Sequence, residues 1–173
     1  MAILKIKKYP DPILRKKCEE VKEITEKIKN LGWDMVETMI ENQGIGLAAP
    51  QVGVLKRIIA VHLIQERTTE EKTAKSPQVF INPKILRKSK ETVIEEEGCL
   101  SFPGLFLKIK RAREIEIESL NEKGEIFHLK AVGLPARVLQ HEIDHLNGIL
   151  IIDRVGFWQK LKINRQLKKN QPQ

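Results

Sequence analysis

The sequence predicts an α+β fold in which antiparallel strands and hairpins surround a central helix, with a further helix at the C-terminus. Two observations carry this prediction. Residues 113–132 alternate apolar and charged side chains on both sides of "NEKG", which is the pattern of a hairpin with one wet face. Residues 133–148, "GLPARVLQHEIDHLNG", predict the central helix, with Pro135 in its first turn and Gly148 just past its end.

The elements before this hairpin are a helix and two strands. Apolar side chains recur near a 3.6-residue period over 21–40, so we expect an amphipathic helix that is interrupted or weakened at Gly32 and stops at "ENQG", with Gly44 as its C-terminal glycine. "RIIAVHL" (57–63) and "QVFINP" (78–83) have the composition of buried strands. The segment between them, "ERTTEEKTAKS", is typical of a polar loop.

The remaining elements flank the hairpin and the central helix. "ETVIEEEGCLSFPG" (91–104) begins as a strand, and we expect breaks at Gly98 and at Pro103-Gly104. After the central helix, "ILII" predicts a short buried strand, and a cationic helix follows from about Val155.

Length and composition indicate one soluble domain. The 173 residues include 41% hydrophobic and 31% charged residues, and no stretch approaches the roughly 20 apolar residues of a membrane span. We therefore expect a single catalytic domain over 1–173, in which about 155–173 form a basic helix and tail. The start of the sequence has no signal-peptide pattern, which favours a cytoplasmic protein.

Charge and cysteine usage leave the partners open. Lys and Arg exceed Asp and Glu by 31 to 23, a net charge of +8, and much of the excess lies in the C-terminal segment and in "LKIKRAR". A solvated cationic face and an anionic partner such as RNA explain this equally well. The cysteines, Cys18 and Cys99, lie far apart without an export signal, so a free thiolate is expected rather than a disulfide.

"QHEIDHLNG" (140–148) is the first chemical motif. His141 and His145 are four residues apart and lie on one face of a helix, so both imidazoles can reach one metal ion. Glu142 is rotated by about 100° from His141, near enough to reach a water at the ion. The same spacing also arises by chance on ordinary helices, so a third ligand must decide.

The third ligand has two candidates. In zinc peptidases it follows the motif, and Asp153 is the only carboxylate downstream of His145. Upstream, Cys99 in "EEEGCLS" offers a thiolate, although a lone cysteine is commonly a buried structural residue. A thiolate with two imidazoles leaves a position for water, as catalysis requires, and such an ion lowers the pKa of bound water toward about 7.

"GIGLAAPQ" (44–51) is a candidate oxyanion site. Its glycines allow a substrate backbone to approach closely, and Gln51 carries an amide donor. A tight glycine turn packed on the core explains the segment equally well. It does not match a phosphate-binding loop, because Ala49 takes the place of the last glycine.

Together, "GIGLAAPQ", "EGCLS" and "QHEIDHLNG" resemble the peptide deformylase family in order and spacing. The resemblance runs from about Pro10 to Asp153 and includes "YPDPILRKK" and "GLPAR". It implies a metal-dependent hydrolase that removes the formyl group from the N-terminal formyl-methionine of new proteins and releases formate.

The resemblance also implies a set of site residues and a cofactor. It implies one divalent ion, Fe²⁺ by expectation, with Zn²⁺, Ni²⁺ and Co²⁺ as alternatives. The partners it implies are N-formyl-methionyl nascent peptides. By position, the implied metal ligands are Cys99, His141 and His145; the catalytic groups are Glu142, Gln51 and the backbone N–H of Leu100; and the substrate-binding residues are Gly46 and Gly98.

Several positions outside these motifs matter for specificity and partners. Phe106 stands about where many bacterial members place an arginine or tyrosine near the methionine pocket. Arg137 and Asp144 are expected to be structural, and His62 and His128 receive no role. The resemblance favours a monomer and suggests ribosome docking through a basic C-terminal helix, with the candidate contacts Lys160, Lys162, Arg165, Lys168 and Lys169.

Two other functions fit parts of the sequence. One is a zinc-dependent peptidase that uses Asp153. The other is a basic RNA-associated module with a structural metal site, which would require a fourth protein ligand.

Overall fold

The structure is a computed structural model that describes residues 2–63 and 77–169. The polar loop expected between the first two strands falls outside these residues. The helices are η1 (Pro12–Arg15), α1 (Glu26–Glu41), η2 (Ala49–Val52), α2 (Leu134–Leu146), η3 (Ile151–Asp153) and α3 (Phe157–Lys169). The strands are β1 (Gly46–Ala48), β2 (Ile58–His62), β3 (Pro77–Lys88), β4 (Thr92–Cys99), β5 (Phe102–Ala112), β6 (Glu114–Leu120) and β7 (Ile126–Val132).

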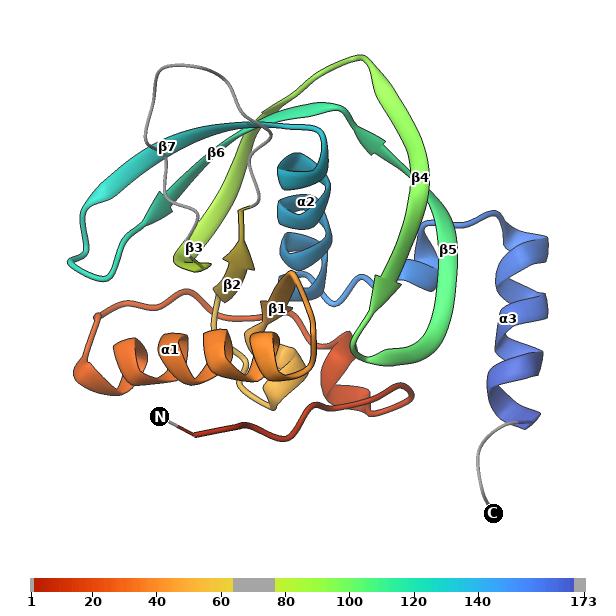
Figure 1. The fold of residues 1–173 in the computed structure, drawn as a ribbon, viewed down its shortest axis with the longest axis horizontal. Coiled ribbons are helices and arrows are strands. Elements are labelled where there is room, and N and C mark those ends of the chain that lie inside the picture. Colours follow the sequence, from red (N-terminus) through yellow and green to blue (C-terminus); the bar gives the residue numbers. More distant parts are fainter. Residues whose placement is uncertain (1, 64–76, 170–173) are drawn as a thin grey trace.

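Two antiparallel sheets enclose α2. The larger sheet has the order β1-β2-β3-β6-β7, and β4 pairs with β5 in a separate two-stranded sheet. Figure 1 shows α2 between these sheets, with α1 along one side and α3 projecting from the body. The predicted α+β class, with antiparallel strands around a central helix and a C-terminal helix, is confirmed.

Strand β2 separates two hydrophobic cores. Ile59 and Val61 pack in the core that contains Leu139 of α2, whereas Ile58 packs in the core that contains Met35 of α1. Successive side chains of a strand point to opposite faces, so an apolar run such as "IIAV" is buried on both sides. Helix α2 thereby packs across one face of the larger sheet, where its Leu139 shares a core with residues of β1, β2, β3, β6 and β7.

Helix α1 ends within "ENQG" as predicted, but it differs from its prediction at its start, at its centre and in the conformation of its C-terminal glycine. It begins at Glu26 rather than at residue 21. Gly32 does not interrupt the helix. A Cβ at this position would lie 2.8 Å from Val79 Cγ1, so the glycine allows the helix to pack closely on β3. The residue with positive φ after the helix is Gln43 (φ 55), and Gly44 is not left-handed.

The β4–β5 hairpin also differs from its prediction. β4 runs through Gly98 and ends at Cys99, and β5 starts at Phe102 and contains Pro103 and Gly104. The strands thus continue through Gly98 and Pro103-Gly104, but the pairing is irregular there: Gly98 pairs with Phe106 and Cys99 with Phe102, which leaves Pro103 and Gly104 in a bulge. A two-stranded sheet has only edge strands, which tolerate proline and glycine, and the turn lies between Cys99 and Phe102.

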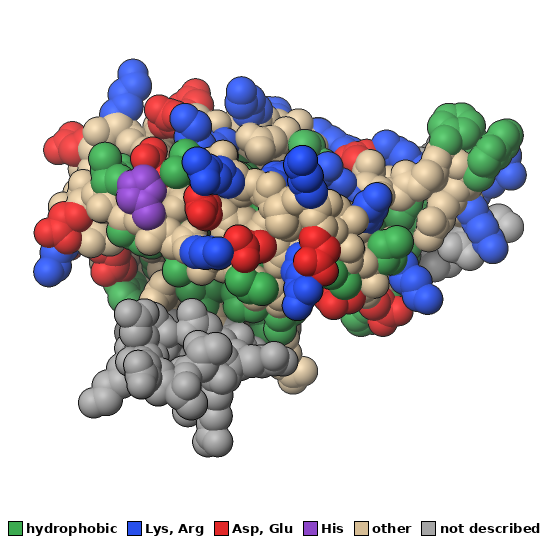
Figure 2. All heavy atoms as spheres, turned by 90° about the horizontal axis from the view of Figure 1, so that it is seen from above, with side chains coloured by type: hydrophobic (Ala, Val, Ile, Leu, Met, Phe, Trp, Pro, Cys, Tyr) green, Lys and Arg blue, Asp and Glu red, His purple; other side chains and the backbone are tan. Residues whose placement is uncertain are grey.

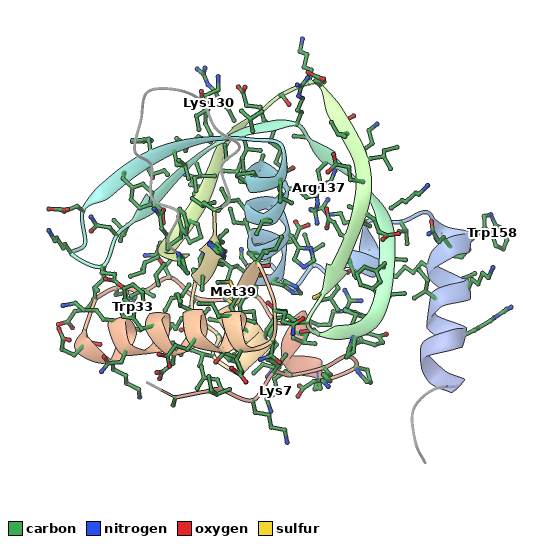
Figure 3. The ribbon with its side chains drawn as sticks, viewed as in Figure 1. Lys7, Trp33, Met39, Lys130, Arg137 and Trp158 are labelled. Carbon is green, nitrogen blue, oxygen red and sulfur yellow. The ribbon has the colours of Figure 1, made fainter. Side chains whose placement is uncertain are left out.

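The segment after α2 is buried as expected but is not a strand. Ile151–Asp153 forms a 3-10 turn, and Ile152 packs with Phe102 and with Ile163 of α3. Trp158, near the start of α3, points away from the body (Figure 3). In the ranges that the structure describes, no helix is both long enough and apolar enough to cross a membrane.

Candidate active site

Three metal-ligating side chains converge beside α2. His141 and His145 lie one turn apart on this helix, and Cys99 is the last residue of β4. The Cys99 Sγ lies 3.3 Å from His145 Nε2, which lies 3.2 Å from His141 Nε2. All three ligand atoms lie within 4.8 Å of one another. The predicted ligand set is therefore brought together in space.

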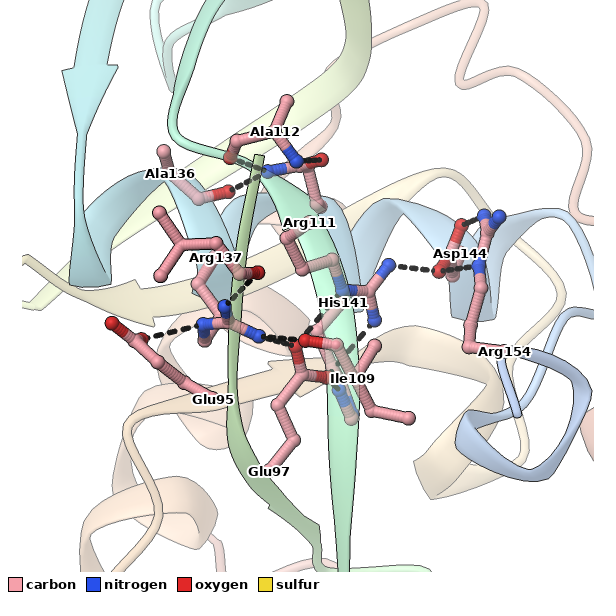
Figure 4. A network of polar contacts seen from close by, with 12 residues as sticks. Glu95, Glu97, Ile109, Arg111, Ala112, Ala136, Arg137, His141, Asp144 and Arg154 are labelled. Atoms are coloured by element: carbon pink, nitrogen blue, oxygen red, sulfur yellow. Dashed lines mark hydrogen bonds and ion pairs between the residues drawn. The ribbon is translucent and has the colours of Figure 1, made fainter. Parts of the chain in front are cut away.

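A buried carboxylate orients His141. The ring Nδ1 of His141 lies 2.9 Å from Glu97 Oε2, which leaves Nε2 directed at Cys99 and His145. Arg111 binds Glu97 with two nitrogens, at 2.9 and 3.0 Å, and Arg137 Nη1 donates to it at 2.6 Å (Figure 4). When one ring nitrogen of a histidine faces a metal ion, a hydrogen bond from the other ring nitrogen to a carboxylate fixes the tautomer and the orientation of the ring.

The charges in this network shift several pKa values. Burial alone would raise the pKa of Glu97, but hydrogen bonds from His141 and Arg111 outweigh it and hold that pKa well below its usual range. Burial would lower the pKa of His141, but contacts with Cys99 and Glu97 raise it. Burial and the positive charge of His141 lower the pKa of His145, which favours the neutral imidazole that a metal ion needs.

The network continues beyond Glu97 to the surface. Arg111 also pairs with Asp144, and Arg154 donates to Asp144 through Nε at 2.8 Å (Figure 4). Arg137 and Asp144 are buried in this network, and Arg137 also lines the active-site cavity. The roles of Glu97 and Arg111 were missed in the sequence. Glu97 could have been found, because a residue two positions before Cys99 faces the same side of a strand.

Glu142 lies beside the three ligands in a tight cradle. Its side chain is buried, and a Cβ on Gly46 would lie 2.8 Å from its Cδ. Burial raises the pKa of Glu142 to about 7, with the positive charge of His141 opposing the shift. A carboxyl group with such a pKa can both accept and donate a proton near neutral pH.

Gln51 presents its amide nitrogen to the same place. Its Oε1 accepts from the Ala48 N–H at 2.8 Å, so Nε2 faces Ser101 Oγ at 3.1 Å and Cys99 Sγ at 3.6 Å. Leu100 follows Cys99 directly in the turn after β4. The two predicted oxyanion donors therefore border the cysteine from different segments.

The residues present fit a divalent metal ion. One thiolate and two imidazoles suit zinc or iron. Within 2–63 and 77–169, the buried Glu142 Oε2 has no hydrogen-bond partner, as expected for an atom that faces a ligand of the ion. The same residues place no fourth protein ligand with Cys99, His141 and His145. Asp153 instead binds Arg15, Lys160 and the Leu150 N–H.

A cavity of about 550 Å³ opens onto these residues. Gly46 and Gly98 line it, as does the apolar side chain of Val138. Phe106 is 62% exposed, and its ring covers Gly98, where a Cβ would lie 2.8 Å from the ring. Phe106 therefore forms part of the cavity wall, where the sequence placed it.

Comparisons with known proteins agree on one family. The family model described as polypeptide deformylase matches residues 3–161. The chain is 45% identical to the peptide deformylase of Neisseria gonorrhoeae over 171 residues, covering 99% of this chain and 98% of the relative. It is 48% identical to that of Thermodesulfovibrio yellowstonii over 156 residues, covering 90% and 91%.

Solved structures give the same match. The crystal structure of peptide deformylase from Ehrlichia chaffeensis in complex with actinonin is 41% identical, with a TM-score of 0.90 and complete coverage of both chains at 100%. The enzyme from Thermotoga maritima is 40% identical with a TM-score of 0.81, covering 90% of this chain and 99% of that one.

Proposed function

This chain belongs to the polypeptide deformylase family, and we propose that Cys99, His141 and His145 hold the single metal ion of its active site. It is a metal-dependent hydrolase that removes the N-formyl group from nascent peptides. The observation that carries the ligand assignment is the approach of the three ligand atoms to within 4.8 Å of one another. The ion we propose is Fe²⁺, with Zn²⁺, Ni²⁺ and Co²⁺ as alternatives that anaerobic purification and metal analysis distinguish.

The proposed chemistry divides between the ion and the protein. When bound, a divalent ion polarises the formyl oxygen and lowers the pKa of a neighbouring water. Gln51 Nε2 and the Leu100 N–H donate to the formyl oxygen as it gains negative charge. The Gln51 amide needs no reorientation for this, because the Ala48 N–H already fixes its other end.

Glu142 moves the proton in this proposal. Its carboxylate takes a proton from the attacking water and then delivers it to the departing amine, which leaves formate and a free N-terminus. Support comes from its burial and from a pKa raised to about 7. Gly46 contributes by leaving room for this carboxylate against β1.

The substrate peptide binds as an added strand in this proposal. β1 is an edge strand of the larger sheet, and Gly98 lies near the end of β4, so the cavity is bordered by two strand edges. An extended peptide can form main-chain hydrogen bonds with the N–H and C=O groups of such edges, while its side chains enter pockets. The methionine side chain then lies against the apolar residues Ile45, Leu134 and Val138 and against Phe106.

A formate-release assay tests this function. We expect metal-loaded protein to release formate from formyl-Met-Ala faster than from formyl-Ala-Ala. Burial of the longer methionine side chain should stabilise the transition state by about 1–3 kcal/mol more than burial of alanine does. Equal efficiency with both peptides would contradict the apolar pocket. No formate from either would contradict the activity itself.

The wider setting of the enzyme is also a proposal. We infer one catalytic domain over 1–173 that acts as a cytoplasmic monomer and contacts the ribosome through α3. Support comes from the basic residues of α3, and Figure 2 shows hydrophobic and cationic side chains together at the end of the molecule where α3 projects. The variant Lys162→Gln/Arg165→Gln should lose co-sedimentation with ribosomes at low salt, whereas Lys108→Gln/Lys110→Gln should keep it; retention by both would contradict this contact.

A further inference from the structure

A second cavity, of about 390 Å³, lies against the last turns of α2 and shares no lining residue with the active site. Its lining is strongly cationic. The one carboxylate in it is Asp144, which is already paired with Arg111 and Arg154. Five cationic side chains line the cavity: Arg57, Lys84, Arg87, Lys88 and Arg154. Arg87 is paired with Glu116 at 3.8 Å, whereas no ion pair is found for Arg57, Lys84 or Lys88 in the part of the chain that the structure describes. Positive charge that is not neutralised inside a concave surface raises the local concentration of anions.

The irregular end of β3 forms one wall of this cavity. The five consecutive residues 84–88 all line the cavity, although a regular strand turns alternate side chains to the other face. The register of β3 against β6 shifts between Ile81 and Lys84 and again between Ile85 and Arg87. Such bulges bend a strand and change the directions of its side chains. In the resulting register Lys84 and Arg87 lie opposite Glu118 and Glu116, and Lys88 lies opposite Ile115.

The two arginines from other segments are held in fixed positions. Arg57 donates through Nη1 to Asn147 Oδ1 and through Nη2 to the Pro83 carbonyl, both at 3.0 Å. Arg154 donates to Asp144 through Nε at 2.8 Å and through Nη2. A guanidinium has five N–H donors, so each arginine keeps donors that these contacts do not use. Fixed donors reduce the entropy cost of binding a ligand.

We propose that this cavity is a binding site for a phosphate group, carried by a free nucleotide or by an RNA strand. Guanidinium groups match the geometry of phosphate oxygens, and the lysines add charge from the surface. The apolar side chains of Ile85 and Ile149, which also line the cavity, give the rest of the ligand a surface to contact.

Lys84 and Lys88 are the residues to change. Both are exposed and lie on the same strand, so their replacement leaves the folded core intact. Arg154 is less suitable, because it also holds Asp144 and through Arg111 reaches the carboxylate that orients His141. Lys108 and Lys110 are the matched control, since they are exposed, two residues apart on β5 and outside the cavity.

The test measures binding of uridine 5′-monophosphate and of an eight-nucleotide oligouridylate to the full chain at low salt. We expect Lys84→Gln/Lys88→Gln to bind roughly tenfold more weakly, and Lys108→Gln/Lys110→Gln to bind as the parent does. For the oligonucleotide, the slope of log affinity against log salt should fall by about 1.4, or roughly 0.7 per lost phosphate contact. Formate release by both variants should equal that of the parent, which separates this site from the proposed catalytic roles.

The outcomes identify the source of the phosphate. A selective loss of mononucleotide binding assigns a free nucleotide, and a selective loss confined to the oligonucleotide assigns an RNA strand. The proposal is overturned if Lys84→Gln/Lys88→Gln and the control Lys108→Gln/Lys110→Gln bind the probes equally weakly, or if the parent binds neither probe.

Discussion

At the scale of single residues, the chemistry depends on side chains that hold other side chains. Residue spacing alone left Cys99 and Asp153 as alternatives for the third ligand, and it was the family resemblance that implied Cys99, His141 and His145, whose side chains the structure brings together. Glu97 and Arg111 could not be assigned with the same certainty. Their function depends on a contact between β4, β5 and α2. Glu97 belongs to "EGCLS" and Arg111 to no motif, and the sequence pattern alone does not indicate that contact.

Gly46 gives a test at this scale. A methyl group in Gly46→Ala would collide with the Glu142 carboxylate, whose Cδ lies 2.8 Å from the ideal Cβ position. Because the carboxylate is the end of a side chain, we expect it to move while the fold remains. Formate release should fall in kcat by roughly 10- to 100-fold, with KM, metal content and melting temperature little changed.

Gly156→Ala is the control for this variant, since a Cβ at Gly156 meets no atom within 4 Å. If Gly46→Ala instead raised KM alone, Gly46 would act only on substrate binding. The proposed positioning of Glu142 would then be wrong.

At the scale of elements, strong periodicity predicted α2 and the β6–β7 hairpin, and weak patterns misled. "ILII" was expected to be a strand, but four apolar residues fit a buried 3-10 turn equally well, and the Asp153 carboxylate accepts from the Leu150 N–H at 2.9 Å to stabilise that turn. Asp153 also binds Arg15 of η1 and Lys160 of α3. One carboxylate thus joins three segments, a role that the sequence does not reveal.

Asp153→Asn tests this junction through the pH dependence of stability. Burial alone would raise the pKa of Asp153, but hydrogen bonds from Arg15, Lys160 and the Leu150 N–H lower it. Because the pKa of Asp153 is lower in the folded state than the unfolded value of about 3.9, its ionised carboxylate stabilises the fold at pH values above about 3.9. This stabilisation is lost as the pH falls through the folded-state pKa. We expect the variant to lose about 1–2 kcal/mol of unfolding free energy at neutral pH and progressively less below about pH 4.

Chemical denaturation across this pH range makes the measurement. Glu41→Gln removes the same charge from a glutamate that makes no ion pair in the described part of the chain, and it should show no such pH-dependent difference. A loss for Asp153→Asn that stays constant down to the lowest pH would contradict the ion-pair explanation.

At the scale of the whole molecule, the site exists because distant segments meet around α2. The class and the surrounding antiparallel strands followed from local patterns, but the sheet order β1-β2-β3-β6-β7 did not. In that order β3 pairs with β6 across the intervening β4–β5 hairpin, a long-range pairing that no local pattern specifies. The β4–β5 hairpin is therefore not part of the larger sheet, and it places Cys99, the last residue of β4, beside the two histidines of α2.

The two cysteines report on this arrangement. Burial raises the pKa of the Cys18 thiol to about 11, with Arg57 opposing the shift, and the residue is 4% exposed. Only Cys99, which is partly exposed, should react with an aromatic disulfide reagent in the metal-free chain. Metal loading should abolish this reaction, and Cys99→Ser should show no reactive thiol in either state. A Cys99 that stays reactive in metal-loaded protein would remove it from the ligand set.

The most direct test of the catalytic site is Glu142→Gln, assayed for metal content and formate release on one preparation. The substitution keeps the shape of the side chain and removes its ability to accept a proton. We expect the ion to be retained, because Cys99, His141 and His145 hold it, while formate release falls by roughly 10²- to 10⁴-fold. An unchanged rate, or loss of the ion together with activity, would contradict the assignment of Glu142 as the proton carrier beside a three-ligand metal site.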